Sequence, residues 1–408
     1  MGNTPNIRFK GFTDDWEQRK FGDVLVSLQN NTLSRADLSN ESGVAKNVHY
    51  GDVLIKFGEV LDVGKEQLPM ITDERVLSKY KASFLQNGDV IVADTAEDST
   101  VGKCSEIVGL NGDIVLSGLH TIPYRPVEKF ATGYLGYYLN SGAYHNQLIP
   151  LMQGIKVTSV SKSAMQDTDI VYPKSVKEQA MIGNCFQSLD HLITLHQRKC
   201  DETKKLKKFM LQKMFPKKDE KKPEIRFADF TDDWEQRKLG DNIIEYTEKT
   251  TINNQYPVLT SSRKGIFFQT EYYDGNQVAS ADNTGYNIVP YGYFTYRHMS
   301  DDEIFHFNIN DIAENGIVST LYPVFTTDEN LDSRYLQYQL NYGREFAKYA
   351  ILQKQGGSRT YMYLNKLKNL YLIVPKSVNE QKRISGYFMQ LDNLITLHQR
   401  KSFFIFSI

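Results

Sequence analysis

The segment FTDDWEQRKLGD at residues 230–241 repeats FTDDWEQRKFGD at residues 12–23 with a single change. The flanking residues extend this opening segment to 5–23 and 223–241, which are identical at 15 of 19 positions. A second, helical segment also occurs twice. PKSVKEQAMIGNCFQSLDHLITLHQRK at 173–199 and PKSVNEQKRISGYFMQLDNLITLHQRK at 375–401 are identical at 18 of 27 positions. The chain is therefore built from two copies of one plan.

Two inserts, residues 24–172 and 242–374, lie between the opening and helical segments of each copy, and their sequences do not align convincingly. A solenoid would repeat every roughly 20 to 50 residues with similar interiors, and this chain does not. Constant segments around different inserts indicate a protein that holds two different readers in two equivalent positions.

The helical segments predict two long helices. Ser175 has the position of an N-cap, with Glu178 three residues later in capping-box spacing. The first helix is expected at about residues 178–214, a length of roughly 55 Å. Within each helical segment, residues recur at alternating steps of four and three, the spacing of the residues that form the seam of a coiled coil. Two such seams in one chain most simply pack on each other, antiparallel if a pseudo-twofold axis relates the copies, with a histidine setting the register in each. The predicted seam residues are Ile182, Phe186, Leu189, Ile193 and His196, and Ile384, Phe388, Leu391, Ile395 and His398.

The inserts predict mixed α+β structure. Short β-branched stretches bounded by turn residues predict strands within 51–64, 87–95 and 371–377, whereas 134–148 and 333–349 are typical of helices. We therefore expect two globular α/β domains, residues 1–172 and 223–374, and two helical regions, 173–222 and 375–408. After HQRK the first copy continues through LKKFMLQKMF, but the second ends in SFFIFSI. The second helix is thus expected to be truncated or altered at its end.

Composition is that of a soluble globular protein: 408 residues, 24% charged, 40% hydrophobic and a formal net charge of -1. No apolar run approaches about 18 residues and the N-terminus lacks a secretory signal, so we expect neither a membrane span nor secretion. The three cysteines form no disulfide framework or CxxC site, which favours the cytoplasm. Charge is uneven, because residues 198–222 carry eleven Lys or Arg against four Asp or Glu. A polyanion would therefore be bound by patches.

Motifs for catalysis are missing from the sequence, which has no HExxH, no GxSxG and no dinucleotide fingerprint. Carboxylates cluster in both opening segments and leave a nuclease centre open as an alternative. The structural interpretation is that Trp16 and Trp234 anchor the opening segments, while the flanking charges cap them or contact a partner. The clustered carboxylates are Asp14, Asp15 and Glu17, and Asp232, Asp233 and Glu235.

The duplicated order of segments resembles the specificity (S) subunits of type I restriction-modification systems, over essentially the whole chain. The resemblance is carried by the IRF…FTDDWEQRKxGD openings at Ile7 and Ile225, the PKSVxEQ…LDxLITLHQRK helices at Pro173 and Pro375, and the LKKFMLQKMF stretch. NGDVIVADTAEDSTVGK at 87–103 is similar to a stretch of that family. Gln-Gly elements, QGIKVTSV at 153–160 and QGGSRTYMYL at 355–364, precede the two helices.

This resemblance implies a non-catalytic subunit in which two target-recognition domains, separated by paired helices, read the two halves of a bipartite double-stranded DNA target. It also implies partners: modification (methyltransferase) subunits, two of them, which bind S-adenosylmethionine, and restriction subunits that use ATP and magnesium. No cofactor is expected in this chain, and no DPPY or NPPF-type methylation tetrapeptide occurs in it. A helix of about 55 Å exceeds one DNA turn of roughly 34 Å, so two domains could reach separate stretches of one duplex.

Base contacts need forked donors and acceptors on loops that enter a groove, whereas phosphate contacts need only positive charge or hydroxyls. Polar residues near the GD stretch, near the Gln-Gly elements and in loops of the second insert meet this requirement. The predicted DNA contacts are Thr95, Ser99, Thr100, Lys103, Gln153, Lys156 and Thr158 in the first insert, and Ser261, Ser262, Arg263, Lys264, Tyr296, Arg297, Ser358, Arg359 and Thr360 in the second.

Two other classes of function remain open. The first is a self-sufficient enzyme, which activity of the isolated chain with magnesium or S-adenosylmethionine would reveal. The second is a scaffold that joins two protein partners through the inserts, which absence of DNA binding by the assembled complex would favour.

Overall fold

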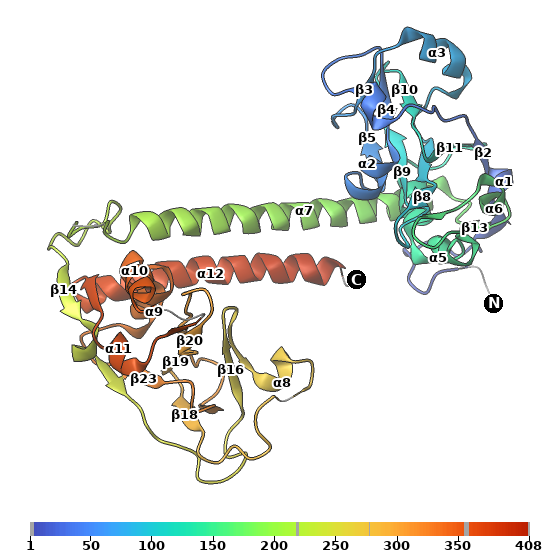
Figure 1. Cartoon of the computed structure of the whole chain (residues 1–408). Helices are drawn as coiled ribbons and strands as arrows, with labels where there is room; N and C mark the ends of the chain where they lie inside the picture. The colour runs from blue at the N-terminus through green and yellow to red at the C-terminus, as the bar shows by residue number, and fades with distance from the viewer. Residues whose placement is uncertain (1–3, 218–219, 277, 355–358, 407–408) are drawn as a thin grey trace. The chain divides into compact units, whose positions relative to one another are not determined.

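The structure is a computed structural model that describes residues 4–217, 220–276, 278–354 and 359–406, without the side chains of 403–406 (Figure 1). The chain divides into two compact units, Met1–Ile193 and Thr194–Ile408. The division falls within the long helix α7 (Val176–Lys213), so each unit contains one insert and part of that helix. No helix among these residues is long and apolar enough to cross a membrane.

The two helical segments form the longest helices, α7 with 38 residues and α12 (Val378–Phe406) with 29. The predicted first helix is confirmed, and at 1.5 Å per residue it is about 57 Å long. Ser175 Oγ accepts a hydrogen bond from the Glu178 backbone at 3.4 Å, as an N-cap does. The Glu178 carboxylate, however, bonds to the opening segment, so only half of the predicted capping box is present.

Each opening segment ties the start of its insert to the end. Strand β1 (Glu17–Lys20) pairs antiparallel with β13 (Asp169–Tyr172), the strand directly before α7. Strand β14 (Glu235–Lys238) pairs with β25 (Tyr371–Val374), directly before α12, in the same register. The repeated EQRK residues therefore close the base of each insert.

A carboxylate on each long helix is the anchor for its opening segment. Arg8 donates to both oxygens of Glu178, at 2.6 and 2.9 Å, and the Trp16 indole N–H donates to the same carboxylate at 3.3 Å. In the second copy Glu380 accepts from Arg226, at 2.6 and 2.8 Å, and from the Trp234 indole at 3.1 Å. This ion pair raises the pKa of Arg226. The anchoring role predicted for both tryptophans is confirmed.

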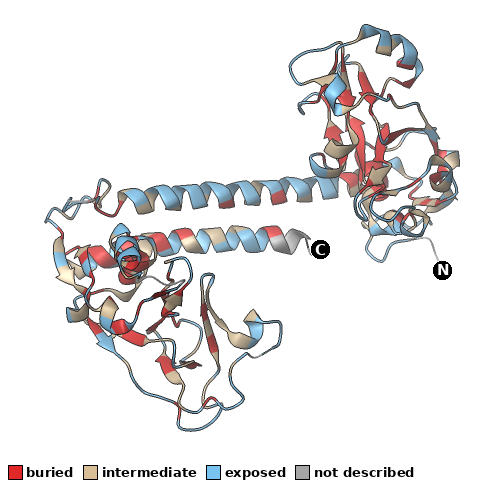
Figure 2. Cartoon of the chain, in the orientation of Figure 1, coloured by how far each residue is buried: buried red, intermediate tan, exposed pale blue. Residues whose placement is uncertain are grey.

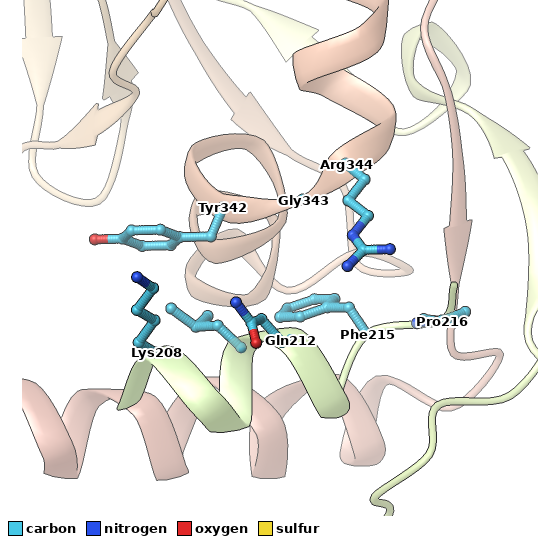
Figure 3. Close-up of a pocket in the computed structure, with 8 residues that line it drawn as sticks. Lys208, Gln212, Phe215, Pro216, Tyr342, Gly343 and Arg344 are labelled. Atoms are coloured by element: carbon cyan, nitrogen blue, oxygen red, sulfur yellow. The ribbon is translucent and has the colours of Figure 1, made fainter. Parts of the chain in front are cut away.

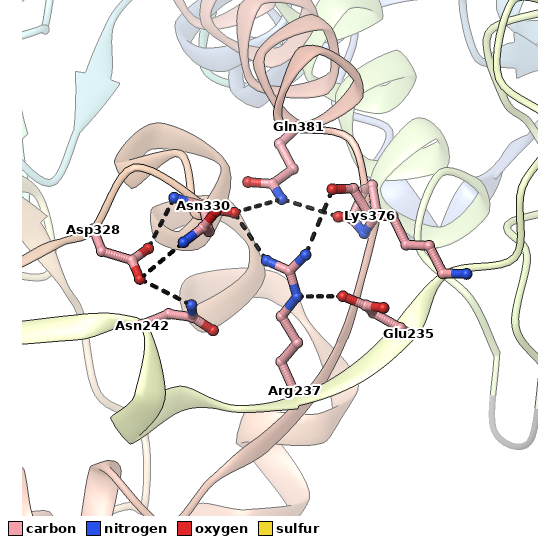
Figure 4. Close-up of polar contacts among 8 residues, drawn as sticks. Glu235, Arg237, Asn242, Asp328, Asn330, Lys376 and Gln381 are labelled. Atoms are coloured by element: carbon pink, nitrogen blue, oxygen red, sulfur yellow. Dashed lines mark hydrogen bonds and ion pairs between the residues drawn. The ribbon is translucent and has the colours of Figure 1, made fainter.

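A glutamine next to this glutamate secures the helix to its insert. In the second copy Gln381 Nε2 donates to the carbonyls of Pro375, at 2.9 Å, and of Asn330, at 3.3 Å. Arg237 from β14 donates to the same Asn330 carbonyl at 2.9 Å, which links strand, loop and helix (Figure 4). Gln179 repeats the bond to the proline carbonyl, with Pro173, at 2.9 Å.

The two inserts share a central sheet, although their sequences do not align. The order is β2-β11-β7-β9-β5 in the first insert and β15-β23-β19-β21 in the second, so four strands correspond in order and direction. The two inserts therefore have a common core in spite of their different sequences. The strands are β2 (Leu25–Ser27), β5 (Val60–Asp62), β7 (Val90–Ala93), β9 (Cys104–Val108) and β11 (Thr121–Pro126), and β15 (Ile243–Glu245), β19 (Phe294–Thr295), β21 (Asn308–Ile309) and β23 (Val324–Thr327).

A helix of the same pattern follows the sheet in both inserts. Helix α4 (Tyr134–Asn140) reads YLGYYLN, and α9 (Ser333–Tyr342) contains YLQYQLN. The asparagine that ends this pattern bonds to both backbone groups of a residue at the start of a sheet strand: Asn140 to Cys104, the first residue of β9, at 2.8 and 3.0 Å, and Asn341 to Phe307, directly before β21, at 3.0 and 2.8 Å. The repeat therefore extends into the inserts, further than the sequence comparison found.

The inserts differ in what surrounds this core. The first carries a four-stranded sheet of order β10-β4-β6-β3 with α2 and α3, and the second carries paired strands β16-β17 and β18-β22 with α8. The strand predicted at the start of 51–64 is wrong, because α2 begins there, with the His49 ring accepting from Gly51 N at 3.2 Å as its cap. The elements are β3 (Leu38–Ser39), β4 (Ala45–Val48), α2 (Tyr50–Ile55), β6 (Met70–Ile71), α3 (Glu74–Tyr80) and β10 (Val115–Ser117), and β16 (Leu259–Ser262), β17 (Gly265–Phe268), α8 (Gln269–Tyr272), β18 (Asn287–Pro290) and β22 (Asn315–Val318).

Burial follows this architecture. Buried residues fill the sheet and the adjoining helices of each unit, whereas most of the surface of α7 is exposed (Figure 2). The remaining short helices lie beside the sheets and complete the two domains. They are α1 (Phe21–Val24), α5 (Gly142–His145), α6 (Lys162–Gln166), α10 (Arg344–Leu352) and α11 (Leu364–Leu367).

Candidate nucleic-acid interface

A short strand pair at the same place in both inserts brings the predicted contact loops together. In the first insert β8 (Thr95–Ala96) pairs with β12 (Thr158–Ser159). In the second, β20 (Met299–Ser300) pairs with β24 (Thr360–Tyr361). The loop that follows the central strand and the loop of the Gln-Gly element, about 60 residues apart in sequence, are therefore neighbours in each insert.

The first of these loop pairs is stiffened by its own hydroxyls. Thr158 Oγ1 donates to the Asp98 carbonyl at 3.0 Å, and Thr100 Oγ1 donates to the Asp98 carboxylate at 2.5 Å. The Thr100 bond holds the pKa of Asp98 below its usual value. Ser99, Gln153 and Lys156 are exposed beside them. These side chains form one polar surface with Lys156 as its cation.

Two other predicted residues of the first insert are bonded within the domain. Lys103 Nζ donates to the Leu54 carbonyl at 2.9 Å and is half-buried, so its charge does not point to the surface loop. Thr95 Oγ1 donates to Asp94 at 2.8 Å. Reading DNA through Lys103 would require this bond to break.

The predicted contacts at 262–264 form the tip of a hairpin. Arg263 and Lys264 connect β16 to β17, and Gly265 has a φ of +126°, which favours glycine. Ser262 Oγ accepts from Lys264 N at 3.1 Å and donates to the Gly265 carbonyl at 3.1 Å. The serine shapes the turn, and the two cations project from it. Arg263 forms an ion pair with Asp302.

Three predicted contacts of the second insert are buried and therefore do not fit the candidate surface. Tyr296 is 0% exposed, and its hydroxyl donates to the Met362 carbonyl at 2.8 Å. Ser261 is bonded to the Thr295 carbonyl at 3.1 Å, and Thr360 is 1% exposed. The three side chains point into the domain from strands β16, β19 and β24 or their ends, so they do not lie on the candidate surface. Ser358 lies outside the described residues.

The exposed arginines of the second insert remain candidates. Arg359 immediately precedes β24, and its Nε donates to Asp301 at 2.9 Å. Arg297 is exposed between β19 and β20. Lys354, which follows α10, was not predicted and forms an ion pair with Glu303. All of these cations surround the β20-β24 pair or the loop after it.

An aromatic stack beside Arg359 was also missed by the sequence reasoning. The rings of His298 and Tyr363 stack with centroids 4.9 Å apart, and Tyr361 stacks on Tyr363 at 5.8 Å. Tyr361 and Tyr363 are 37% and 48% exposed. The alternating YMY of QGGSRTYMYL was the available signal, since alternation places both tyrosines on one face.

The paired helices are visible within the second unit. His196 and His398 face each other with Nδ1 atoms 3.1 Å apart, Cys200 Sγ lies 3.9 Å from the Ile395 carbonyl, and Lys207 forms an ion pair with Asp392 at 2.6 Å. Along α7, residues with higher numbers contact residues of α12 with lower numbers. The predicted antiparallel pairing is therefore confirmed for this part of α7 and α12.

The other predicted seam residues pack on the domains as well as, or in place of, the opposite helix. Ile384, Phe388 and Leu391 are buried in the core of the second insert, where Phe388 packs on Tyr338 of α9, with ring centroids 5.2 Å apart. The equivalent Phe186 is 48% exposed and stacks on Tyr137. The seam positions nearest the start of each helix therefore pack on the domains, and those further along face the other helix. Ile182 packs on the first core, Leu189 is half-buried and Ile193 is buried.

A pocket of about 190 Å³ lies where α7 ends against the link between α9 and α10 (Figure 3). Its cations, Lys208 and Arg344, approach from different helices, and Tyr342 and Phe215 supply aromatic walls. The pocket adjoins the basic end of α7 and lies outside the candidate DNA loops. It is lined by Lys208, Leu211, Gln212, Phe215, Pro216, Tyr342, Gly343 and Arg344.

Two carboxylates of the second opening segment form ion pairs with nearby cations. Asp233 pairs with Lys222 at 3.1 Å and Glu235 with Arg237 at 2.6 Å. No group of three or more His, Cys, Asp or Glu side chains among the described residues is arranged to hold a metal ion.

Comparison with known proteins gives a consistent result. The family model described as type I restriction modification DNA specificity domain matches twice, at residues 13–205 and 231–402. A Methanocaldococcus jannaschii protein assigned as the type I restriction enzyme MjaX specificity subunit is 23% identical over 95% of this chain and 89% of its own length. The S subunit of the type I restriction-modification system from M. genitalium has the same fold, with a TM-score of 0.57, 11% identity and coverage of 99% and 96%. The HsdS subunit from Thermoanaerobacter tengcongensis aligns with a TM-score of 0.48, 16% identity and coverage of 98% and 94%.

Proposed function

Because the chain belongs to the family of type I restriction-modification DNA specificity domains and carries two of them, it is a specificity subunit, and we propose that its two inserts read the two halves of a bipartite DNA target. One observation carries this proposal. The same sheet and the same strand pair, β8-β12 or β20-β24, recur in both inserts, while the exposed side chains around the pair differ.

The difference between the two loop surfaces is chemical. Around β8-β12 the exposed groups include hydroxyls, an amide, Lys156 and the carboxylates of Glu97 and Asp98. Around β20-β24 they include guanidinium groups, tyrosines and the carboxylates of Asp301 and Asp302. Arginine recognises guanine through O6 and N7, whereas amides and hydroxyls suit adenine or mixed contacts. We therefore expect two different half-sequences, with guanine favoured in the half that the second insert reads.

The chain is proposed to have no catalytic role. Two modification subunits that bind S-adenosylmethionine would methylate adenine, and restriction subunits would use ATP and magnesium, all in the cytoplasm. The exposed surface of α7, with the basic run 198–222 and the pocket at Lys208 and Arg344, supports α7 as a docking surface for these partners. Part of that basic charge is already paired, as at Lys207 with Asp392 and Lys213 with Glu224.

The test is genome-wide mapping of N6-methyladenine in cells that express this chain with its matching modification subunit. A specificity subunit gives one methylated sequence with two defined halves and an undefined spacer. Cells that express the modification subunit alone are the control. Methylation that does not depend on the chain, or a complex that binds no DNA, would contradict the proposal and favour a protein scaffold.

A further inference from the structure

Three consecutive acidic residues in the second insert each bind a different candidate cation. Asp301 accepts from Arg359 Nε at 2.9 Å, Asp302 pairs with Arg263, and Glu303 pairs with Lys354. The cations come from three places in the chain: the residue before β24, the tip of the β16-β17 hairpin and the residues just after α10. One short loop therefore binds three of the cations of this surface.

The backbone holds these carboxylates in place. Strand β20 ends at Ser300, which is opposite Thr360 in β24, so Asp301 lies beside Arg359. Ser300 is buried, and its hydroxyl donates to the Asp302 carboxylate at 2.8 Å. Arg263 and Ser300 together hold the pKa of Asp302 below its usual value, so the carboxylate stays charged at neutral pH. The loop is thus a fixed acidic element rather than a free tail.

Neither stability nor affinity for DNA accounts for such a loop. All three cations and two of the three carboxylates are largely exposed, and exposed ion pairs contribute little to folding. Carboxylates beside a DNA-binding surface also repel phosphate and occupy cations that would otherwise bind it. What the pairs do provide is orientation, because each fixes a long side chain that would otherwise sample many rotamers.

We propose that Asp301, Asp302 and Glu303 are positioning residues that orient Arg359, Arg263 and Lys354 for base contacts and keep them from binding phosphate indiscriminately. This inference rests on the proposed function of the second insert as a DNA reader. The positioning loop, residues 301–303, raises the selectivity of that insert and lowers its affinity for DNA in general.

The geometry at Arg359 supports a base-reading role. Asp301 occupies the Nε side of the guanidinium group, and Nη1 lies 3.7 Å from the Met299 sulfur, a weak acceptor. The two terminal nitrogens therefore keep N–H groups available for O6 and N7 of guanine, the pair of acceptors that arginine reads. A freely rotating arginine would reach phosphate oxygens as readily as a base edge.

The experiment uses the complex of the full chain with its modification subunits and the variants Asp301→Asn, Asp302→Asn and Glu303→Gln, singly and together. Asp311→Asn is the matched control, because Asp311 forms an ion pair with Arg334 away from this loop. Binding is measured against duplexes that carry the mapped target and duplexes with the second half scrambled, at several salt concentrations. The methylated sequence is mapped in cells for each variant.

Positioning predicts an unusual combination of results. Each loop variant binds scrambled duplexes roughly three- to tenfold more tightly, its salt slope steepens by about one, and the second half of the methylated sequence becomes degenerate. The first half stays unchanged, and so does the Asp311→Asn control. Loop variants that keep the second half intact, or that weaken binding to all duplexes together with a lower melting temperature, would overturn the inference while leaving the proposed function in place. Loss of sequence-specific binding by the unmutated complex would overturn both.

Discussion

His196 and His398 hold the same position in the two helical repeats and face each other, with their Nδ1 atoms 3.1 Å apart. In an antiparallel pair of helices, equivalent positions meet only where a local twofold axis crosses the pair. The contact also requires that one Nδ1 carries a proton and donates a hydrogen bond, while the other Nδ1 is unprotonated and accepts that hydrogen bond. The histidines therefore mark the register that the repeat predicted.

This pair makes the stability of the second unit depend on pH. Burial, followed by the charges of His196, Lys199 and Lys401, lowers the pKa of His398 below about 6.5, its unfolded value. The unfolded chain then binds the proton more readily, so stability is present above about pH 6.5 and is lost as pH falls below it. We expect the melting temperature to drop between pH 7.5 and 5.5, and to drop less in His398→Gln. An equal drop in both proteins would exclude this histidine as the cause. The pKa values of His49 and His306 are also lowered, but both proteins retain these residues, so their contributions cancel in the comparison.

The anchor of the second opening segment should contribute more to stability than the first. Glu178 and Glu380 are both 1% exposed, but Glu380 binds the buried Trp234 as well as Arg226, so Glu380→Gln leaves an unpaired guanidinium group and should cost about 3–5 kcal/mol. Glu178→Gln is the matched change in the first copy, where Trp16 is only half-buried. Urea unfolding of both variants measures the difference. A smaller loss for Glu380→Gln than for Glu178→Gln would show that burial of the anchor does not decide its contribution.

The repeated phenylalanine of the helical segment offers a second matched pair. Phe388 is 0% exposed and packs on Tyr338, so Phe388→Ala should cost about 3–5 kcal/mol. Phe186 is 48% exposed, and Phe186→Ala should cost less than about 1 kcal/mol in the isolated chain. Comparable losses in the same unfolding measurement would mean that Phe186 is buried as deeply as Phe388.

Arginine and lysine substitutions should separate base reading from general attraction. Arg359→Ala is expected to weaken binding to the mapped target by about 1–3 kcal/mol and to relax one half of it. The double change Lys204→Ala with Lys205→Ala, on α7, should weaken binding to all sequences equally and flatten the salt dependence. Titration of target and scrambled duplexes distinguishes the two. Sequence preference that survives Arg359→Ala would remove this arginine from the reading surface.

Much of the fold was readable because the repeat is strong. The long helices, the anchoring tryptophans and the antiparallel pairing follow from residues that occur twice. The shared sheet of the inserts did not, because a sheet core needs only apolar residues of suitable size and many sequences meet that requirement. The YLxYxLN pattern of α4 and α9 is the one similarity that the two insert sequences keep, since its asparagine must reach both backbone groups of Cys104 or Phe307.

The candidate interface was predicted by region rather than by residue. Thr158 lies in β12 and Arg359 directly precedes β24, but which of their neighbours point inward depends on where each short strand begins, which the sequence does not mark. Thr360 and Tyr296 consequently proved to point inward. The positioning loop at 301–303 was missed because its role depends on three ion pairs between distant segments, and ion pairs of that kind leave no pattern along a sequence.

The most direct measurement of the central claim is an exchange of residues 242–374 for the corresponding insert of another specificity subunit. The opening and helical segments remain, so β14, the Glu380 anchor and helix α12 are kept, and the last strand of the new insert takes the place of β25 beside β14. N6-methyladenine mapping should then show a new sequence in one half of the target, with the other half and the spacer unchanged. A hybrid that changes both halves, or neither, would contradict the account of two independent readers on one repeated scaffold.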